Sequence, residues 1–286
     1  MYIYGTDEAG YGPNLGPLVI TVTVWETPAE DLTFLAAPLK DAGILIADSK
    51  KIYHGGQSLS VLENNVLAVL RHIGSCPELP DLQEQRIAAL AKNFGDVLSD
   101  YKVRLLDIKS RIIEPAEFNV LLDRYASKGS LLSQETMRLA AAAAKNQCSG
   151  KRPVRQLFLC DKHGGRNRYL DLLTEHFAGY FVNVLRESLE QSVYRFDDGN
   201  NVTDNNVTEW RFIAKGESHL PVALASMVSK YRRETAMKMF NAFWLLHVPG
   251  LKPTAGYPED AKRFIKDISA AKAALGIADD VLWRRK

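Results

Sequence analysis

The sequence predicts an α/β fold with a mixed sheet. Two apolar, β-branched segments at 2–6 and 17–25 come first, and the Gly- and Pro-rich turn between them indicates a hairpin. Further strand-like segments then alternate with segments of helical periodicity. Such an order is typical of a mixed sheet flanked by helices. No Pro-, Gly- or Ser-rich linker divides the 286 residues, so we expect one domain over 1–286.

The later elements follow from the same two periodicities. Apolar and β-branched residues predict strands at 102–113, 154–160, 180–196 and 207–214. Helical spacing predicts helices at about 59–73, 82–98, 115–126, 133–146, 168–177, 221–246 and 259–275. We expect a Ser-Lys-Lys loop at 49–51 and a turn at 197–201. The region of about 59–150 is rich in helix, and we interpret it as an insertion and not as a separate domain.

Composition excludes several classes of protein. The chain is 46% hydrophobic and 24% charged with a net charge of +2, so any affinity for nucleic acid must come from local clusters of basic residues. Three scattered cysteines fit reduced thiols and a cytoplasmic protein better than a disulfide framework. We expect neither a signal peptide nor a membrane span, because no apolar run is long enough.

Acidic residues stand where two predicted strands end. The stretch T-D-E-A-G-Y-G-P-N-L-G-P at 6–17 places Asp7 and Glu8 at the end of the first strand, directly before glycines. Alternation along the strand directs the two side chains to opposite faces. Asp161 ends the strand at 154–160, shortly before Gly164 and Gly165. Strand ends are where α/β sheets bind ligands, although a strand-terminal Asp is as often a helix cap or a turn former.

A further acid, Glu234, borders the apolar stripe of the helix at 221–246. By spacing alone, an exposed Glu234 paired with Lys230 or Lys238 is the favoured interpretation. Glu234 becomes a site residue only if the site needs a fourth acid. Four converging carboxylates would repel one another unless divalent cations neutralised them. Two such ions bind oxygen ligands and clamp a scissile phosphate between them.

Five segments resemble the type 2 ribonuclease H family, which includes ribonucleases HII and HIII. They are D-E-A-G-Y-G-P-N-L-G-P-L-V from residue 7, A-D-S-K-K at 47–51, F-L-C-D-K-H-G-G at 158–165, A-K-G-E-S-H-L-P-V-A-L-A-S-M-V-S-K-Y-R-R-E at 214–234, and G-Y-P at 256–258. Their order and rough spacing agree with the family. The resemblance covers the ends of the chain well and the region of about 59–150 poorly.

The resemblance implies a ribonuclease H-like fold and a metal-dependent endonuclease. Such an enzyme hydrolyses RNA in RNA·DNA hybrids, or ribonucleotides embedded in DNA. It implies that two Mg²⁺ or Mn²⁺ ions bind Asp7, Glu8, Asp161 and Glu234. It also implies that Gly10, Tyr11 and Gly12 lie along the substrate backbone, and that Tyr257 contacts a sugar on the DNA side.

Three positions depart from the family pattern. Tyr11 stands where ribonuclease HII has Arg, and Glu234 stands where it has Asp. After G-Y-P the chain has Glu259 and Asp260 in place of Thr and a nearby His. These departures concern substrate preference more than metal binding. The chain starts at the strand with the first acids, so we expect no preceding substrate-binding domain of the ribonuclease HIII type.

Basic residues flank the proposed ligands. We expect Lys50, Lys51 and Lys215 to contact phosphates. Two basic clusters lie beside the acids, although a basic run is more often a solvated face. The first cluster comprises Lys151, Arg152, Arg155, Lys162, Arg166 and Arg168, and the second comprises Lys230, Arg232 and Arg233. His163 is either a loop histidine, which is the favoured interpretation, or a proton relay.

Other functions fit less well. The spacing G-Y-G-P-N-L-G misses the dinucleotide fingerprint, and no G-K-[ST] of a phosphate-binding P-loop is present. The alternatives to a ribonuclease H are a related nuclease with another substrate and a non-catalytic nucleic-acid-binding protein of the same fold. We expect the chain to act as a monomer on nucleic acid and not on a membrane.

Overall fold

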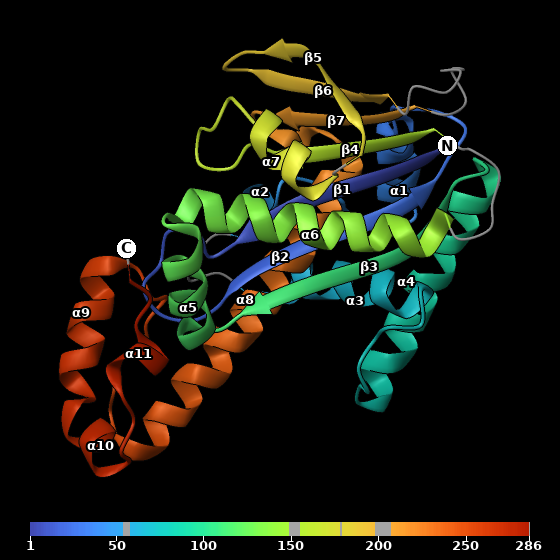
Figure 1. Cartoon of the computed structure of the whole chain (residues 1–286). Coiled ribbons are helices and arrows are strands. Elements are labelled where there is room, and N and C mark those ends of the chain that lie inside the picture. The colour runs from blue at the N-terminus through green and yellow to red at the C-terminus, as the bar shows by residue number, and fades with distance from the viewer. Residues whose placement is uncertain (54–57, 149–154, 178, 198–206, 286) are drawn as a thin grey trace.

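A seven-stranded sheet forms the centre of the fold (Figure 1). The computed structural model describes residues 1–53, 58–148, 155–177, 179–197 and 207–285. Within them the strand order is β3-β2-β1-β4-β7-β6-β5. The strands are β1 (Tyr2–Ala9), β2 (Leu18–Glu26), β3 (Arg104–Ile113), β4 (Gln156–Asp161), β5 (Phe181–Glu187), β6 (Gln191–Asp197) and β7 (Thr208–Ile213).

The sheet is mixed, as the sequence predicts. Strand β1 is antiparallel to β2 and parallel to β4, and β4 is parallel to β7. The outer pairs β2–β3, β7–β6 and β6–β5 are antiparallel. Because β1, β4 and β7 run in the same direction, their carboxyl ends meet at one edge of the sheet. The acids that end β1 and β4 are therefore neighbours.

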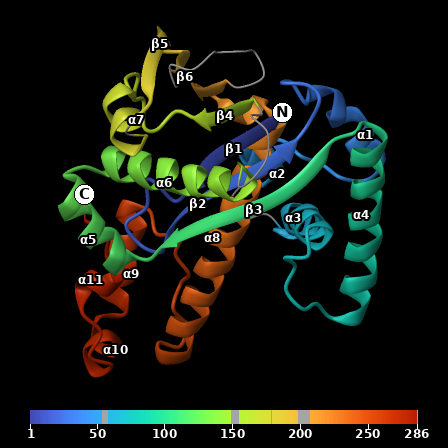
Figure 2. The same cartoon turned by 45° about the vertical axis from the view of Figure 1, so that its right-hand side comes forward.

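Helices cover both faces of the sheet (Figures 1 and 2). Helices α6 and α7 lie on one face, whereas α8 and α3 lie on the other. No helix among the described residues is long and apolar enough to cross a membrane. The helices are α1 (Ala36–Asp41), α2 (Ser49–Ile52), α3 (Ser60–His72), α4 (Asp81–Asp100), α5 (Pro115–Tyr125), α6 (Lys128–Cys148), α7 (Leu170–His176), α8 (Leu220–His247), α9 (Pro258–Asp267), α10 (Ser269–Ala274) and α11 (Asp279–Leu282), with 3-10 turns η1 (Thr33–Leu35) and η2 (Gly216–Ser218).

The two faces of β1 pack into two separate hydrophobic cores. Ile3 belongs to the core under α3 and α8, whereas Tyr4 belongs to the core under α6 and α7. Tyr4 stacks on Phe158 of β4, with ring centroids 4.4 Å apart, and Phe158 stacks on Trp210 of β7 at 4.0 Å. Burial on both faces explains why β1 and β2 are almost continuously apolar.

Helix α8 is held close to the sheet because Gly5 has no side chain. A Cβ at Gly5 would lie 2.3 Å from the carbonyl carbon of Pro221, in the first turn of α8. The Thr23 hydroxyl on β2 donates to the Pro221 carbonyl over 2.9 Å. These contacts fix the beginning of α8 against the two strands that frame the site.

The C-terminal helices pack on the second half of α8. Trp244 of α8 and Phe264 of α9 share a separate hydrophobic cluster there. From this cluster the chain returns to the loop after β1. The Asn14 side chain donates to the Arg284 carbonyl over 2.9 Å, and the Arg284 amide donates back to the Asn14 carbonyl over 2.8 Å. The buried Arg284 guanidinium also donates to the Pro13 carbonyl.

Four sequence predictions differ from the structure. The expected strand at 180–196 is a hairpin of β5 and β6, whose turn closes through hydrogen bonds between Ser188 and Gln191 and contains no Gly, Pro or Asn. The expected helix at 259–275 is divided at Ile268 into α9 and α10. The Ser-Lys-Lys segment forms the short helix α2, and α1 has no counterpart in the prediction. The turn at 197–201 falls largely outside the described residues.

The helix-rich region of about 59–150 contributes to the sheet. It contains helices α3 to α6, but between α4 and α5 it supplies β3, which pairs with β2 along its whole length. Helices α3 and α6 also contribute to the cores on opposite faces of the sheet. The region is thus continuous with the rest of the fold.

Substituting Gly5 tests the approach of α8 to the sheet. Because the new methyl group would collide with backbone atoms, Gly5→Ala should lower the free energy of unfolding by about 3 kcal/mol or more. Gly129→Ala is the matched control, since Gly129 lies in α6 and its Cβ would meet only the Tyr11 hydroxyl at 3.7 Å. Urea unfolding measures both variants. Equal stability of the two variants would contradict the close packing at Gly5.

Candidate active site

One pocket lies at the carboxyl ends of β1 and β4. Four acids from three elements line it: Asp7 and Glu8 of β1, Asp161 of β4, and Glu217 of η2. The pocket has a volume of about 380 Å³ and a largely polar lining. The other lining residues are Ala9, Gly10, Tyr11, Ser49, Lys50, Tyr53, Ser226, Lys230, Arg233 and Tyr257.

The pair of acids on β1 has one buried and one half-buried member. The Asp7 side chain is 6% exposed, and its Oδ1 accepts a hydrogen bond of 2.8 Å from the Glu8 amide. Glu8 is half-buried. The sequence predicts opposite faces for the two side chains, and at the strand end both border the same pocket.

A tight turn before α8 brings Glu217 to Asp161. Lys215 has a left-handed backbone with φ of 60°, and the Gly216 amide donates to Asp161 Oδ1 over 2.7 Å. A Cβ at Gly216 would lie 3.1 Å from the Asp161 Cα, so a larger residue there would press against the backbone of β4. The next residue, Glu217, is 10% exposed and has Lys50 Nζ 3.4 Å from its Oε1.

Sequence analysis missed Glu217. Glu217 lies in the segment K-G-E at 215–217, directly before the helix, and an acid next to a glycine at that place could have indicated a site residue. The resemblance instead implied Glu234, further along the chain. Spacing within one helix does not reveal that a turn two residues long folds back onto the end of β4.

Glu234 does not line the pocket, whereas Glu217 does. The Glu234 carboxylate pairs with Lys230 at 2.7 Å and with Arg233 at 3.6 Å. This is the surface-type pairing that spacing favours, with Lys230 rather than Lys238 as the partner. Both partners line the pocket, so Glu234 lies behind its basic wall.

Solved structures match this chain along almost its whole length. A chain of the PCNA–RNase HII complex from Archaeoglobus fulgidus matches with a TM-score of 0.52 and 15% identity, covering 100% of this chain and 95% of that one. The ribonuclease H2 from Pyrococcus horikoshii matches with a TM-score of 0.52 and 18% identity, covering 99% and 92%. Bst-RNase HIII, solved with Mn²⁺, matches at 0.45 and 15%, covering 99% and 66%.

The fold is ribonuclease H-like. At these identities the likeness concerns the fold alone. No family model matches the sequence, and no curated protein matches it. The expected fold class is thus confirmed.

The acids of this pocket repel one another. Burial, reinforced by Asp161 and Glu217, raises the pKa of Glu8 to about 8. Burial and then Glu8 raise the pKa of Asp7 well above its ordinary value. Burial also raises the pKa of Asp161, although the Gly216 amide opposes the shift. Lys50 opposes the shifts of Glu8 and Asp161 but does not cancel them.

A group of carboxylates provides the oxygen ligands that a hard divalent cation prefers. Asp161 and Asp7 each use one oxygen to accept a backbone N–H, which orients the carboxylate. Among the described residues, no group of three or more His, Cys, Asp or Glu side chains lies close enough together to hold a metal ion. The donor chemistry fits Mg²⁺ or Mn²⁺, while binding would require the side chains to draw together.

The predicted phosphate contacts have different environments. Lys50 lines the pocket, whereas Lys51 and Lys215 are exposed and lie outside its lining. Lys162 is buried, and its ammonium donates to Asn167 over 2.7 Å and to the Ser188 carbonyl over 2.5 Å. Lys162 is therefore a structural residue and not a phosphate contact.

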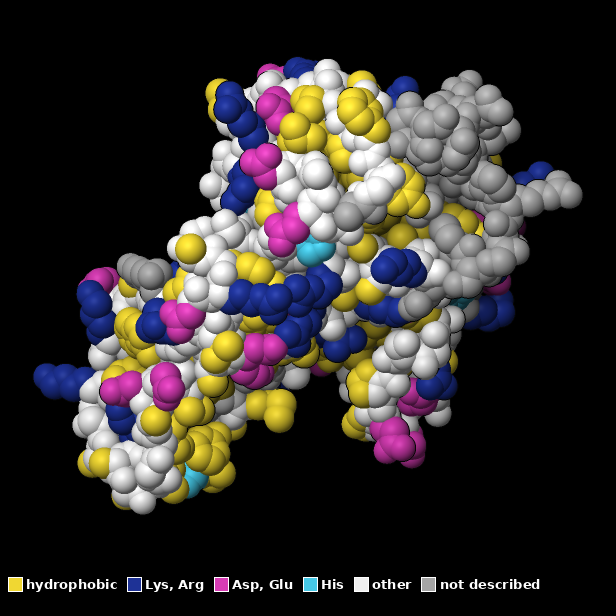
Figure 3. Space-filling view, in the orientation of Figure 1, with side chains coloured by type: hydrophobic (Ala, Val, Ile, Leu, Met, Phe, Trp, Pro, Cys, Tyr) yellow, Lys and Arg dark blue, Asp and Glu magenta, His cyan; other side chains and the backbone are white. Residues whose placement is uncertain are grey.

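The rest of the basic cluster at 151–168 is only partly accessible. Arg155 pairs with Glu30, and Arg166 donates to the Ser130 hydroxyl over 3.2 Å. Arg168 is exposed. Lys151 and Arg152 lie outside the described residues. Figure 3 shows further Lys and Arg side chains across the middle of the face covered by α6 and β3. On those two elements, Arg111 and Arg138 both pair with the buried Glu135.

His163 is a structural histidine. It is 3% exposed, its Nδ1 lies 3.0 Å from the Ser133 hydroxyl, and its ring meets Tyr169 and Phe212 edge-on. Burial, followed by Arg166, lowers the pKa of His163 to about 3. A neutral imidazole enclosed in this way fits the loop interpretation and not a proton relay.

Side chains of other elements pack closely against the glycine loop at residues 10–12, after β1. Gly10 has φ of 90°, and a Cβ there would lie 2.5 Å from Arg233 Nε. A Cβ at Gly12 would lie 3.8 Å from Tyr257 Cε1. Between them, the half-buried Tyr11 places its hydroxyl against Gly164. Gly10, Tyr11 and Tyr257 line the pocket, so three of the expected substrate contacts lie together.

The raised pKa of Glu8 predicts a pH dependence of stability. Since the pKa rises from 4.5 to about 8 on folding, the folded chain binds more protons in this range. Without divalent cations, the free energy of unfolding should fall as pH rises through this range. Glu8→Gln should flatten the slope and stabilise the chain at the alkaline end by on the order of 2 kcal/mol.

Urea unfolding in chelator across this pH range measures the effect. Glu190→Gln is the matched control, because the Glu190 side chain is 86% exposed. Identical slopes for the two variants would show that Glu8 does not titrate as its surroundings require.

Proposed function

We propose that the chain is a metal-dependent endonuclease that hydrolyses RNA in RNA·DNA hybrids or ribonucleotides embedded in DNA. The observation that carries this proposal is the convergence of Asp7, Glu8, Asp161 and Glu217 in one pocket of a ribonuclease H-like fold. A surface that only binds phosphates gains nothing from these carboxylates, since they repel the ligand. A hydrolase that recruits cations needs them.

In this proposal, Asp7, Glu8, Asp161 and Glu217 hold two Mg²⁺ or Mn²⁺ ions. When bound, such ions supply an activated water and stabilise the leaving oxygen of the phosphodiester. The carboxylate set provides the negative charge that draws the ions in. The Gly216 and Glu8 amides orient two of these carboxylates before any ion arrives.

The chain's basic and main-chain groups position the nucleic acid. Lys50, Lys230 and Arg233 line the same pocket and attract the phosphates of a strand that must approach a cluster of acids. In this proposal the backbone of Gly10 to Gly12 contacts a ribose 2′-hydroxyl, and Tyr257 stands across from Gly12. Main-chain groups sense a hydroxyl whatever the side chain, so Tyr11 in place of Arg is compatible with recognition of RNA.

Two amide substitutions distinguish Glu217 from Glu234 as the fourth acid. Glu217→Gln should lower the cleavage rate at least about a hundredfold, because even outer-shell partners of metal ligands cost up to that much. It should also weaken Mn²⁺ binding in calorimetry without substrate. Glu234→Gln is the matched control on the basic wall, and it should retain metal affinity and most of the activity. The reverse ranking would return the ligand role to Glu234.

A panel of labelled substrates tests the function as a whole. RNA·DNA hybrid, a duplex with one embedded ribonucleotide, plain DNA and plain RNA are incubated with Mg²⁺ or Mn²⁺. Cleavage of either ribonucleotide-containing duplex that Asp7→Asn abolishes supports the proposal. Hybrid binding that falls with salt, persists in chelator and never leads to cleavage would instead identify a non-catalytic binding protein.

A further inference from the structure

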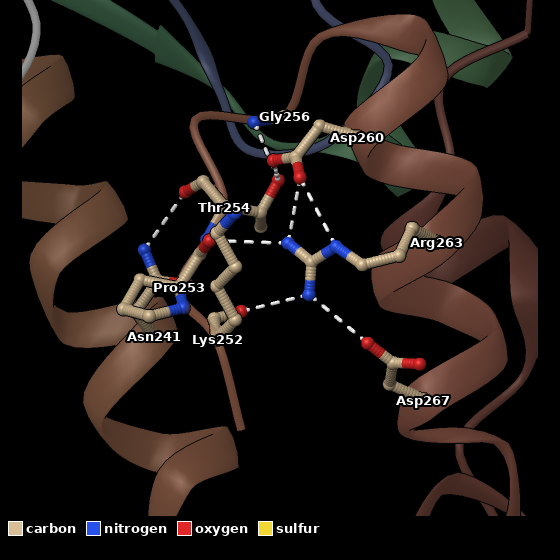
Figure 4. A network of polar contacts seen from close by, with 8 residues as sticks. All are labelled: Asn241, Lys252, Pro253, Thr254, Gly256, Asp260, Arg263 and Asp267. Atoms are coloured by element: carbon tan, nitrogen blue, oxygen red, sulfur yellow. Dashed lines mark hydrogen bonds and ion pairs between the residues drawn. The ribbon is translucent and has the colours of Figure 1, made fainter. Parts of the chain in front are cut away.

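Five consecutive carbonyl groups before Tyr257 accept hydrogen bonds from other elements. Arg263 of α9 donates to the Lys252 carbonyl over 2.9 Å and to the Pro253 carbonyl over 3.1 Å. Asn241 of α8 donates to the Thr254 carbonyl over 2.9 Å. Figure 4 shows these contacts converging on the segment from two helices. The carbonyl groups of this irregular segment thus find their hydrogen-bond donors in other parts of the fold.

The same pattern continues to the edge of the pocket. Arg233 donates to the Ala255 carbonyl over 2.9 Å. The amides of Asn14 and Leu15 both donate to the Gly256 carbonyl, over 2.8 and 3.2 Å. The segment therefore joins α8, α9 and the glycine loop after β1.

A single hydroxyl lies at the centre of this network. The Thr254 hydroxyl accepts from the Gly256 amide over 2.9 Å and donates to Asp260 Oδ2 over 2.5 Å. Arg263 in turn holds Asp260 Oδ1 through two nitrogens, at 2.6 and 3.1 Å. Thr254 is 4% exposed, so water cannot easily replace its hydroxyl.

Gly256 transmits this geometry to Tyr257. Gly256 is buried with φ of 82°, and a Cβ there would lie 2.5 Å from the Leu15 carbonyl oxygen. The next residue, Tyr257, is 55% exposed, and its ring lines the pocket opposite Gly12. A displacement of Gly256 would therefore change the distance between the ring and the glycine loop.

We propose that Thr254 is a positioning residue for substrate binding: its hydroxyl fixes Gly256, and thereby sets the spacing between the Tyr257 ring and the Gly12 backbone. This inference rests on the proposed function, because the slot between ring and loop matters only if a nucleic-acid strand enters it. Thr254 does not line the pocket that contains Asp7, Glu8, Asp161 and Glu217. It acts on the Michaelis constant and not on the chemical step.

Valine and serine separate the hydroxyl from the shape of the side chain. Thr254→Val keeps the volume but leaves the Gly256 amide unpaired. We expect it to raise KM for an RNA·DNA hybrid about tenfold, with kcat nearly unchanged. Thr254→Ser keeps the hydroxyl and should restore KM. Thr174→Val is the matched control, since Thr174 is exposed and its hydroxyl donates to the Leu170 carbonyl one turn earlier in α7.

A second substitution tests whether Thr254 acts through the ring. If it does, Tyr257→Ala should raise KM by itself, and adding Thr254→Val should raise it little further. Additive effects would mean that the hydroxyl acts elsewhere. Hydrogen exchange at residues 255–257 provides an activity-free measurement, and Thr254→Val should accelerate it there while leaving β1 unchanged.

The outcomes separate this inference from the proposed function. A wild-type chain that neither cleaves nor binds hybrid removes both. If the wild-type chain cleaves hybrid and Thr254→Val loosens 255–257 without changing KM, this inference is wrong and the proposed function stands. Asp260→Asn provides a second variant should Thr254→Val fail to fold. It should raise KM with kcat nearly unchanged, because the Thr254 hydroxyl loses the carboxylate that orients it, and an unchanged KM would overturn the assignment to Thr254.

Discussion

The parallel pairing of β1 with β4 is the constraint on which the site depends. It brings residues about 150 positions apart in the chain to one edge of the sheet, with Thr6 opposite Cys160 and an acid directly after each. Gly5 then lets α8 approach from one face, and the turn at Lys215 and Gly216 adds Glu217 from beside β7. The pocket is therefore a product of sheet topology, because neither Asp161 nor Glu217 would meet Asp7 and Glu8 in an isolated hairpin or helix.

Much of this arrangement could be predicted from the sequence. Continuous apolar runs revealed β1, β2 and β4 because these strands are buried on both faces, and the acids that end β1 and β4 marked the edge where the pocket forms. The sequence could not reveal contacts that depend on the three-dimensional course of the loops. Glu217 approaches Asp161 through a left-handed Lys215, which no periodicity reports. Lys162 and His163 lie in a basic segment, yet both point into the protein because the loop turns inward after β4.

The site combines two opposed electrostatic layers. The sheet brings acids together at the strand ends, and basic residues of α2 and α8 line the same pocket. Glu234 belongs to the outer layer, because it holds Lys230 and Arg233 in place rather than adding a fifth acid within. Spacing along α8 predicted this pairing of Glu234 with a lysine, whereas the resemblance to the type 2 ribonucleases H implied that Glu234 is a metal ligand.

The exchange of hydrogen bonds between Asn14 and Arg284 has a consequence for how this chain tolerates change. The backbone that follows the first acids is braced by residues near the other end of the polypeptide, beyond every segment that contributes to the pocket. A substitution or an added tag near Arg284 can thus change the conformation of the glycine loop while every acid of the pocket is retained. Comparisons among variants of this protein should hold that terminus constant.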